Sequence, residues 1–195
     1  MKIHVISDTH FNHQKLVEFE KRPANFNEII IRNWNKTVAD DDLVIHLGDV
    51  ILGHDSSLDT ILTRCKGRKV LARGNHDHKS IDWYMARGFD FVCDYFVYKN
   101  LAFSHAPLTP LPLQNNRQKS GTENWEARNV DLNIHGHFHR GTHRGIVGRP
   151  DRYYDFEYFD ANRPKYHLIQ IEDNLRPVML NEVLAKAGVE LNIIS

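Results

Sequence analysis

Five short apolar segments of the sequence each end in a cluster of polar residues, and this repeated arrangement limits the possible folds more than any other feature. The segments cover residues 2–7, 43–47, 69–72, 101–104 and 132–134. Apolar, β-branched runs of this length, bounded by turn residues, are typical of buried strands. Because the polar residues follow directly, each cluster lies at the carboxyl end of a predicted strand. Open α/β sheets bind their ligands at that edge.

Helical patterns lie between the first strands. Apolar residues at every fourth position predict a helix over 26–38, and Asn25, three positions before Glu28, is expected to cap it. Further helices are expected at 57–65 after a Ser56 cap, at 81–87 between Ser80 and Gly88, and at 181–187. Strands that alternate with helices predict βαβ units and a largely parallel sheet.

The second half of the chain departs from this alternation. Residues 91–97 and 101–104 are separated by Tyr98-Lys99-Asn100, which predicts a hairpin. Residues 106–130, rich in Pro, Asn, Gln and charge, predict a long loop with a short helix. An aromatic run at 153–159 is expected to pack in the core, with a partner surface as the alternative, before a last strand at 166–171. Because the sequence contains no repeat or linker, we expect a single domain over residues 1–195.

Composition narrows the classes of function. The 25 Lys and Arg residues balance the 25 Asp and Glu residues, which excludes a chain-wide basic surface for nucleic acid. A hydrophobic content of 41% and a charged content of 26% are typical of a soluble globular protein. Two cysteines are too few for a disulfide framework, and no apolar run is long enough for a signal peptide or a membrane span. We therefore expect a cytoplasmic protein with no membrane partner.

The polar clusters share one coordination chemistry. They offer carboxylate oxygen, imidazole nitrogen and one amide oxygen but no thiolate, a mixture that suits manganese, iron or zinc better than calcium or an iron–sulfur cluster. A metal pair also needs a bridging ligand, and a carboxylate can bridge. Residues two apart at a strand end point to the same side, so Asp8 and His10 can hold one ion. The same spacing lets His137 and His139 place one ring on each of two ions.

These clusters resemble, in order, the five signature blocks of the calcineurin-like metallophosphoesterase superfamily. The blocks are Asp8-x-His10, Gly48-Asp49, Gly74-Asn75-His76-Asp77, His105 and Gly136-His137-x-His139. The short chain and its Asp8-Thr9-His10-Phe11 opening are similar to the compact bacterial and phage branch of predicted phosphoesterases. One departure is Ser104, before His105, where many members carry glycine. The resemblance implies an α/β fold, a four-layer α/β/β/α sandwich of two mixed sheets.

The resemblance also implies a ligand set for two divalent ions. Metal one would be held by Asp8, His10, Asp49 and His139, and metal two by Asp49, Asn75, His105 and His137, with Asp49 as the bridge. Manganese is the expected metal, with iron, zinc, nickel or magnesium as alternatives. A hydroxide shared by the metals would attack phosphorus, and His76 would protonate the leaving oxygen as general acid. Asp77 is expected either to orient the local turn or to cap the next helix.

The substrate implied by the resemblance is a phosphate ester. We favour a phosphodiesterase acting on a nucleotide, cyclic nucleotide or nucleic-acid end, because the Gly-Asn-His-Asp block is more similar to the diesterase branches of the family than to its protein phosphatases. A phosphomonoesterase acting on a small metabolite or phosphoprotein is the alternative. A metal-bound interaction module without turnover is a third and more distant hypothesis. Nucleic acid enters these hypotheses only as a substrate, and the oligomeric state stays open.

Overall fold

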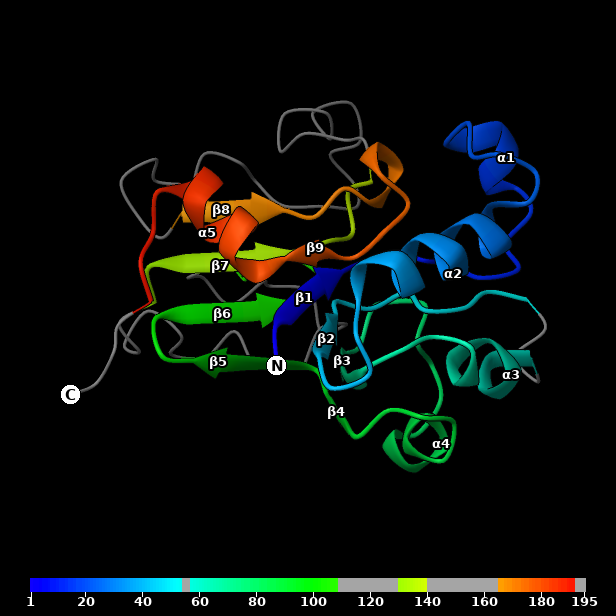
Figure 1. Cartoon of the computed structure of the whole chain (residues 1–195), viewed down its shortest axis with the longest axis horizontal. Coiled ribbons are helices and arrows are strands. Elements are labelled where there is room, and N and C mark those ends of the chain that lie inside the picture. Colours follow the sequence, from blue (N-terminus) through cyan, green and yellow to red (C-terminus); the bar gives the residue numbers. More distant parts are fainter. Residues whose placement is uncertain (54–56, 109–129, 140–164, 192–195) are drawn as a thin grey trace, which may run out of the picture.

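The computed structural model describes residues 1–53, 57–108, 130–139 and 165–191, which form two mixed β-sheets flanked by helices (Figure 1). The first sheet has the strand order β4-β3-β2-β1-β9, and the second has the order β5-β6-β7-β8. The first contains β1 (Ile3–Ile6), β2 (Leu43–His46), β3 (Arg68–Ala72), β4 (Phe91–Cys93) and β9 (Val178–Met179). The second contains β5 (Tyr95–Tyr98), β6 (Leu101–Ser104), β7 (Leu132–His135) and β8 (Lys165–Leu168). The predicted α/β fold with two mixed sheets is confirmed.

Parallel pairing places successive strand ends at one edge of each sheet. β1 pairs in parallel with β2, and β2 with β3, so Ile6, His46 and Leu71 are neighbours in register. In the second sheet the parallel pairing of β6 with β7 sets Ser104 beside His135. Only β9 and β5 run antiparallel to their neighbours among the described strands, which makes both sheets mixed. The polar clusters that follow the parallel strands therefore leave each sheet on the same side.

Helices cover one face of the first sheet. On this face lie α1 (Leu16–Phe19), α2 (Phe26–Thr37), α3 (Leu58–Thr63) and α4 (Ile81–Met85), whereas α5 (Leu180–Ala187) packs on the opposite side. In α2, Phe26, Ile30 and Trp34 are fully buried and pack with Ile6 and Leu71 of the sheet. The residues at four-residue spacing in the sequence therefore form the face by which α2 packs against the sheet.

A second apolar cluster fills the space between the sheets. Val5 and Ile45 of the first sheet meet Phe103 and Ile134 of the second sheet in this cluster. Successive strand residues point to opposite faces, so Val5 lies between the sheets while Ile6 faces the helices. Helix α5 contributes to the same cluster and contacts β1, β8 and β9.

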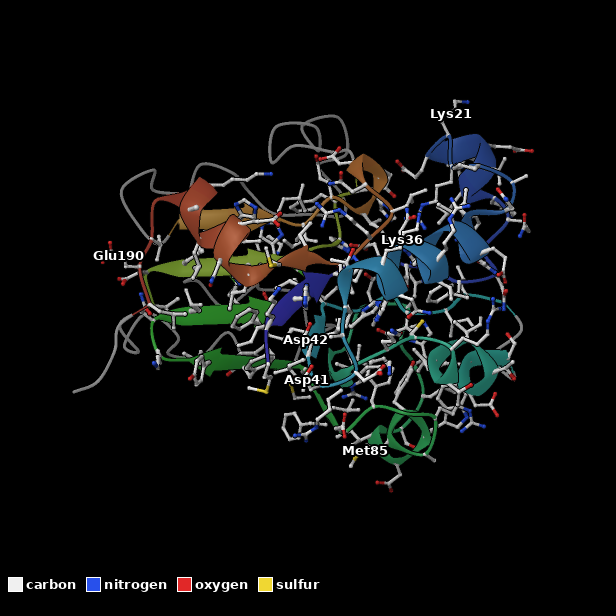
Figure 2. All side chains as sticks on the ribbon, viewed as in Figure 1. Lys21, Lys36, Asp41, Asp42, Met85 and Glu190 are labelled. Carbon is white, nitrogen blue, oxygen red and sulfur yellow. The ribbon has the colours of Figure 1, made fainter. Side chains whose placement is uncertain are left out.

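Asp42 ties the start of β2 to its surroundings. Its buried carboxylate accepts hydrogen bonds from the backbone N–H of Lys2 at 2.6 Å and of Ala39 at 3.0 Å, and it lies 3.0 Å from His4 Nε2. The backbone N–H groups of Lys2 and Ala39 hold the pKa of Asp42 well below its usual range. The neighbouring Asp41 is instead exposed (Figure 2). Asp41 pairs with the N-terminal ammonium at 3.4 Å, whereas Asp42 binds two backbone N–H groups.

The single strand predicted over residues 91–97 is wrong. The chain bends at Asp94 into β4 and β5, which belong to different sheets. β4 pairs in parallel with β3, whereas β5 forms the predicted hairpin with β6, with Lys99 in its turn at a φ of 56°. Asp94 Oδ1 accepts a hydrogen bond of 3.0 Å from Arg73 Nε, next to β3. A continuous apolar pattern does not reveal that its two halves choose different partner strands.

The predicted helix caps have different outcomes. The Ser80 side chain accepts a hydrogen bond from Trp83 N–H, which confirms the cap of α4. Asn25 precedes α2 as predicted but makes no side-chain cap hydrogen bond, so the predicted capping box is wrong. The reason is its backbone, which has a ψ of 30° rather than the extended conformation typical of a capping residue. The predicted Ser56 cap lies outside the described residues.

Two long segments that the sequence singled out lie mostly outside the described residues. The predicted loop at 106–130 is described only at its ends, and the aromatic run at 153–159 is not described. At the start of the loop, Leu108 N–H donates to Asn133 Oδ1 and Tyr166 Oη donates to the Leu108 carbonyl. The loop therefore leaves from a point fixed to the second sheet. Within the described ranges, no helix has the length and apolar character needed to cross a membrane.

Candidate metal centre

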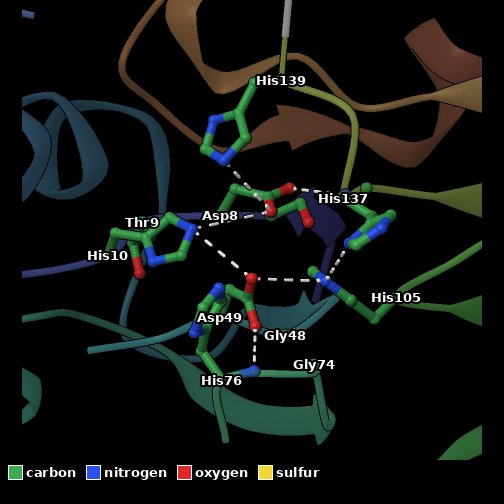
Figure 3. A network of polar contacts seen from close by, with 12 residues as sticks. Asp8, Thr9, His10, Gly48, Asp49, Gly74, His76, His105, His137 and His139 are labelled. Carbon is green, nitrogen blue, oxygen red and sulfur yellow. Dashed lines mark hydrogen bonds and ion pairs between the residues drawn. The ribbon is translucent and has the colours of Figure 1, made fainter. Parts of the chain in front are cut away.

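The backbone turns sharply at the strand ends that carry the predicted ligands. Among the described non-glycine residues with positive φ are five of these ligands, namely Asp8 (52°), His10 (43°), Asp49 (56°), His137 (75°) and His139 (49°). A non-glycine residue in the left-handed region costs about 1–3 kcal/mol, and such residues concentrate at functional sites. The turns direct side chains from both sheets toward one place (Figure 3).

Two glycines of the predicted blocks allow the loops at this edge to touch. A Cβ at Gly48, where φ is 89°, would collide with the backbone nitrogen of Gly74, so the loops after β2 and β3 are in direct contact. A Cβ at Gly136 would collide with the side chains of Ser7 and Asp8, so the loop after β7 lies against the loop after β1. Both sheets therefore contribute to one continuous site.

The first cluster of candidate ligands contains Asp8, His10 and His139. The Nε2 atoms of His10 and His139 lie 4.0 and 3.8 Å from Asp8 Oδ1. That oxygen is buried and has no hydrogen-bond partner among the described residues, whereas Asp8 Oδ2 accepts a bond of 2.9 Å from His137 N–H. Leaving a carboxylate oxygen buried and unpaired is costly. Its position beside two imidazole nitrogens fits a cation-binding role.

The second cluster contains Asp49, His105 and His137. His105 Nε2 lies 3.3 Å from Asp49 Oδ2, 2.9 Å from Asn75 Oδ1 and 3.1 Å from His137 Nδ1. Its other ring nitrogen, Nδ1, donates a hydrogen bond of 2.7 Å to the Leu47 carbonyl oxygen, which fixes the orientation of the ring. The structure thus brings together the four residues expected around metal two.

Asp49 connects the two clusters (Figure 3). Its Oδ2 atom lies 3.4 Å from His10 Nε2 of the first cluster and 3.3 Å from His105 Nε2 of the second. Its other oxygen, Oδ1, accepts a hydrogen bond of 2.9 Å from His76 N–H. The carboxylate is therefore held by one oxygen and presents the other to both clusters.

Burial and neighbouring charges set the protonation of these groups. Burial lowers the pKa of His10 to about 2, and burial together with the charge of His105 lowers the pKa of His137 to about 3. Against the effect of burial, His105 keeps the pKa of Asp49 below its usual range. Burial raises the pKa of Asp8, a penalty that a nearby cation would relieve. Neutral imidazoles and ionised carboxylates are the forms that bind metals, and the pKa shifts of His10, His137 and Asp49 favour these forms. Against the effect of burial, Asp49 raises the pKa of His105 to about 9, so an ion in the second cluster would displace a proton from that ring. The oxygen and nitrogen donors of the two clusters fit two divalent ions.

Comparison with known proteins identifies the family. The model of the calcineurin-like phosphoesterase superfamily domain matches residues 1–148, which is most of the chain. The chain belongs to the calcineurin-like phosphoesterase superfamily. All five strand-end clusters lie within the matched residues of this phosphoesterase domain.

Similar proteins extend the comparison. A stretch of 82 residues is 42% identical to the uncharacterized protein MJ1445 of Methanocaldococcus jannaschii, covering 39% of this chain and 47% of that protein. The chain thus spans about half the length of this curated relative. A protein of unknown function from Aquifex aeolicus, AQ665, shares the fold with a TM-score of 0.69 at 23% identity, over 95% of this chain and 98% of that one. Nuclease MPE of Pseudomonas putida gives a TM-score of 0.45 at 18% identity, over 70% of this chain and 61% of that one.

In this phosphoesterase domain, Asp77 orients the turns that carry other site residues. Its carboxylate accepts hydrogen bonds from the backbone N–H groups of Asp49, Val50 and Gly74 at 2.7, 3.1 and 2.8 Å. The cap of the next helix is Ser80 instead. Of the two roles that the sequence left open for Asp77, the structure selects the first.

His76, the predicted general acid, lies at the exposed side of the candidate site. The centroid of its ring is 5.4 Å from that of His10, and its backbone N–H is bound by Asp49. The preceding residue, Asn75, is also exposed, although its Oδ1 reaches His105. The loop after β3 therefore carries one candidate ligand and the candidate acid together.

Sequence reasoning missed two charged residues of the candidate site. Glu172, which follows β8, contacts His139, and Arg22, between α1 and α2, contacts Glu172. Burial opposes the ionisation of Glu172, but the hydrogen bond from His139 and the charge of Arg22 lower its pKa to about 2. Neither residue has a distinctive spacing, and both lie far in sequence from the candidate ligand His139. The sequence contains no signal that would have found them.

Proposed function

We propose that this phosphoesterase domain hydrolyses phosphate esters with a pair of divalent metal ions, and that phosphodiesters are its substrates. The observation that carries the proposal is the position of Asp49 Oδ2, 3.4 Å from His10 Nε2 and 3.3 Å from His105 Nε2. One carboxylate oxygen is thus within reach of an ion in either cluster. Paired-metal hydrolases hold their ions about 3.5–4 Å apart, a spacing that one bridging ligand can span.

The proposed ligands divide between the two clusters. Asp8, His10, Asp49 and His139 would hold one ion, and Asp49, Asn75, His105 and His137 the other. When bound, such a metal pair supplies an activated water nucleophile and neutralises the charge that develops on the phosphate oxygens. The chain's own part is to hold these side chains in place, through the left-handed turns and the hydrogen bonds from His137 N–H to Asp8 and from His76 N–H to Asp49. Manganese is the metal we propose, because the ligands are oxygen and nitrogen without thiolate.

His76 is the proposed general acid. Imidazole is the side chain that most often exchanges protons near neutral pH. The exposed ring of His76 stands beside the first cluster, where a substrate bound to the ions would meet it. Its role would be to donate a proton to the ester oxygen as the bond to phosphorus breaks.

The preference for diesters rests on the Gly-Asn-His-Asp block, which is similar to that of the diesterase branches of the family. In this block, Asp77 holds the turn that carries Asn75 and His76. The substrates we favour are a nucleotide, a cyclic nucleotide or a nucleic-acid end. Phosphomonoesters are the competing class, and a direct rate comparison separates the two.

The test is hydrolysis of bis-nitrophenyl phosphate and nitrophenyl phosphate by manganese-loaded protein, with a chelated sample and the Asp49→Asn variant as controls. Faster cleavage of the diester, abolished by chelation and by the substitution, is the expected result. Faster cleavage of the monoester would overturn the diester preference and keep the metal-dependent hydrolysis. If metal-loaded protein cleaved neither ester nor any member of a panel of nucleotides and oligonucleotides, the proposed hydrolase function would be wrong.

A further inference from the structure

A buried carboxylate outside the stretch matched by the family model contacts one of the proposed metal ligands. Glu172 belongs to a short 3-10 helix, η4 (Ile171–Asp173), and its Oε1 lies 2.9 Å from Nδ1 of His139. The Glu172 side chain is only 1% exposed, and the His139 side chain is 17% exposed. The contact is therefore largely shielded from water, where a charged hydrogen bond is strong.

Arg22 holds this carboxylate in place. Its Nε and Nη2 atoms donate to Glu172 Oε1 at 3.1 and 2.5 Å, and the Arg22 side chain is also 1% exposed. The same guanidinium donates to the backbone carbonyls of Asp8 and Thr9, at 2.7 Å each. One buried cation thus fastens Glu172 to the loop that carries Asp8 and His10.

The hydrogen bond determines which nitrogen of the His139 ring is available to an ion. A carboxylate beside a guanidinium is ionised and can only accept, so His139 donates through Nδ1. The opposite nitrogen, Nε2, is then the one directed at Asp8 Oδ1, 3.8 Å away. Hydrogen bonds of this kind fix ring orientation and raise the basicity of histidines that bind metals.

We infer that Glu172, held by Arg22, is a positioning residue that turns His139 Nε2 toward the ion of the first cluster. The inference rests on the proposed function, because it assigns His139 to that ion. It predicts that one of two metal sites depends on a residue 33 positions after the last proposed ligand. The second site does not depend on it, because its own ring, His105, is oriented by a backbone carbonyl.

Glu172 also belongs to a group with Glu20 and His139 whose ligand atoms lie within 4.8 Å of one another. Oε2 of Glu172 is buried and makes no hydrogen bond within the described residues. An additional ion there would face the guanidinium of Arg22, which already provides the positive charge beside Glu172. Electrostatic repulsion therefore favours the positioning role over a third metal site. Metal stoichiometry distinguishes these possibilities, since a third site would bring three ions per chain.

The experiment is equilibrium dialysis of metal-free protein against manganese, comparing wild type, Glu172→Ala and Asp173→Asn. Asp173 is an exposed carboxylate on the same 3-10 helix and serves as the matched control. We expect two ions for wild type and Asp173→Asn. In Glu172→Ala we expect one ion to keep its affinity and the other to bind about 10–100-fold more weakly. Electron paramagnetic resonance should show the signal of a coupled manganese pair replaced by that of single ions.

A double-substitution comparison separates positioning from general destabilisation. If Glu172 acts through His139, adding Glu172→Ala to His139→Ala should weaken manganese binding no further. The inference would be overturned if folded Glu172→Ala kept wild-type affinity at both sites, or if both sites were weakened equally. It would also be overturned if Glu172→Ala caused an equal further loss in the His139→Ala background, or if the wild-type chain bound three ions. If the alanine variant does not fold, Glu172→Gln keeps the side-chain volume and is judged by the same outcomes. Wild-type protein that bound no manganese would instead contradict the proposed function.

Discussion

The candidate site has two halves, which are the first cluster (Asp8, His10 and His139) and the second cluster (Asp49, His105 and His137). Both halves offer the same kinds of candidate ligand, but different groups orient their histidine rings. In the first half, Nδ1 of His139 is bound by the carboxylate of Glu172, which is held by a buried arginine. In the second half, Nδ1 of His105 is bound by the backbone carbonyl of Leu47. A carboxylate brings a charge and can be removed by substitution, whereas a carbonyl oxygen belongs to the strand end itself. The first half therefore depends on distant side chains, and the second depends on the fold.

The sheets explain this difference. Leu47 directly follows β2 in the first sheet, and His105 directly follows β6 in the second. The hydrogen bond between them is thus made by two strand ends that the inter-sheet core already holds together. His139 lies beyond the end of β7, four residues after His135, and needs support from outside the sheets.

The largest effect is expected where the halves meet. Asp49→Asn weakens the proposed bridge between two ions, so hydrolysis should fall by about 10²–10³-fold or more and the bound manganese should fall below two ions per chain. Metal analysis and nitrophenyl ester kinetics measure both quantities. Asp41→Asn, at an exposed carboxylate, is the control. An Asp49→Asn variant that kept two ions at wild-type affinity would show that the halves are not joined through this residue.

The next largest effect is expected from removing the proposed general acid, which belongs to neither half. His76→Ala should keep both ions, because its side chain belongs to neither cluster. Turnover of esters with poor leaving groups should fall by about 10²–10⁴-fold, and nitrophenyl esters should be affected less because their leaving group needs little protonation. His78→Ala, an exposed histidine two residues later, is the control. Loss of a metal ion from His76→Ala would contradict its role as an acid.

Removing one ring from each half tests whether the halves bind metal separately. His139→Ala and His105→Ala should each weaken one ion, leaving about one per chain at a manganese concentration that fills both wild-type sites. Titration calorimetry of the two variants measures this. We expect His139→Ala to keep the ion of the second half and His105→Ala to keep the ion of the first half. The double variant should therefore bind neither ion tightly. Loss of both ions from either single variant would mean that the halves form one cooperative unit.

The smallest effect concerns a hydroxyl that links the loops of the two halves. Thr9 Oγ1 lies 2.9 Å from His46 Nε2 and donates to the Val50 carbonyl at 2.8 Å. Thr9→Val leaves His46 with an unpaired buried nitrogen, so we expect a loss of about 1–3 kcal/mol in the free energy of unfolding without a change in manganese stoichiometry. Denaturant unfolding compares it with Thr63→Val at an exposed helical site. If Thr9→Val and Thr63→Val had equal free energies of unfolding, the Thr9 hydroxyl would not stabilise the contact between these loops.

The contrast between residues placed by strand ends and residues placed by distant contacts also explains which features could be predicted from the sequence. The meeting of candidate ligands placed next to a strand, such as Asp8, Asp49 and His105, was predictable because strand ends in parallel sheets meet at one edge. Their place in the fold follows from local pattern and from the resemblance to a known family. Glu172 and Arg22 were not predictable, because their contacts depend on the tertiary structure that brings residues 150 positions apart together. The division of residues 91–97 at Asp94 was missed for the same reason, since partner choice and not local pattern decides it.

The most direct test of a two-ion site centred on Asp49 is the anomalous diffraction of crystals grown with manganese. We predict two anomalous peaks about 3.5–4 Å apart, on either side of Asp49 Oδ2, one beside Asp8 and His139 and the other beside His105 and His137. A single peak, or two peaks that do not share Asp49, would contradict the account.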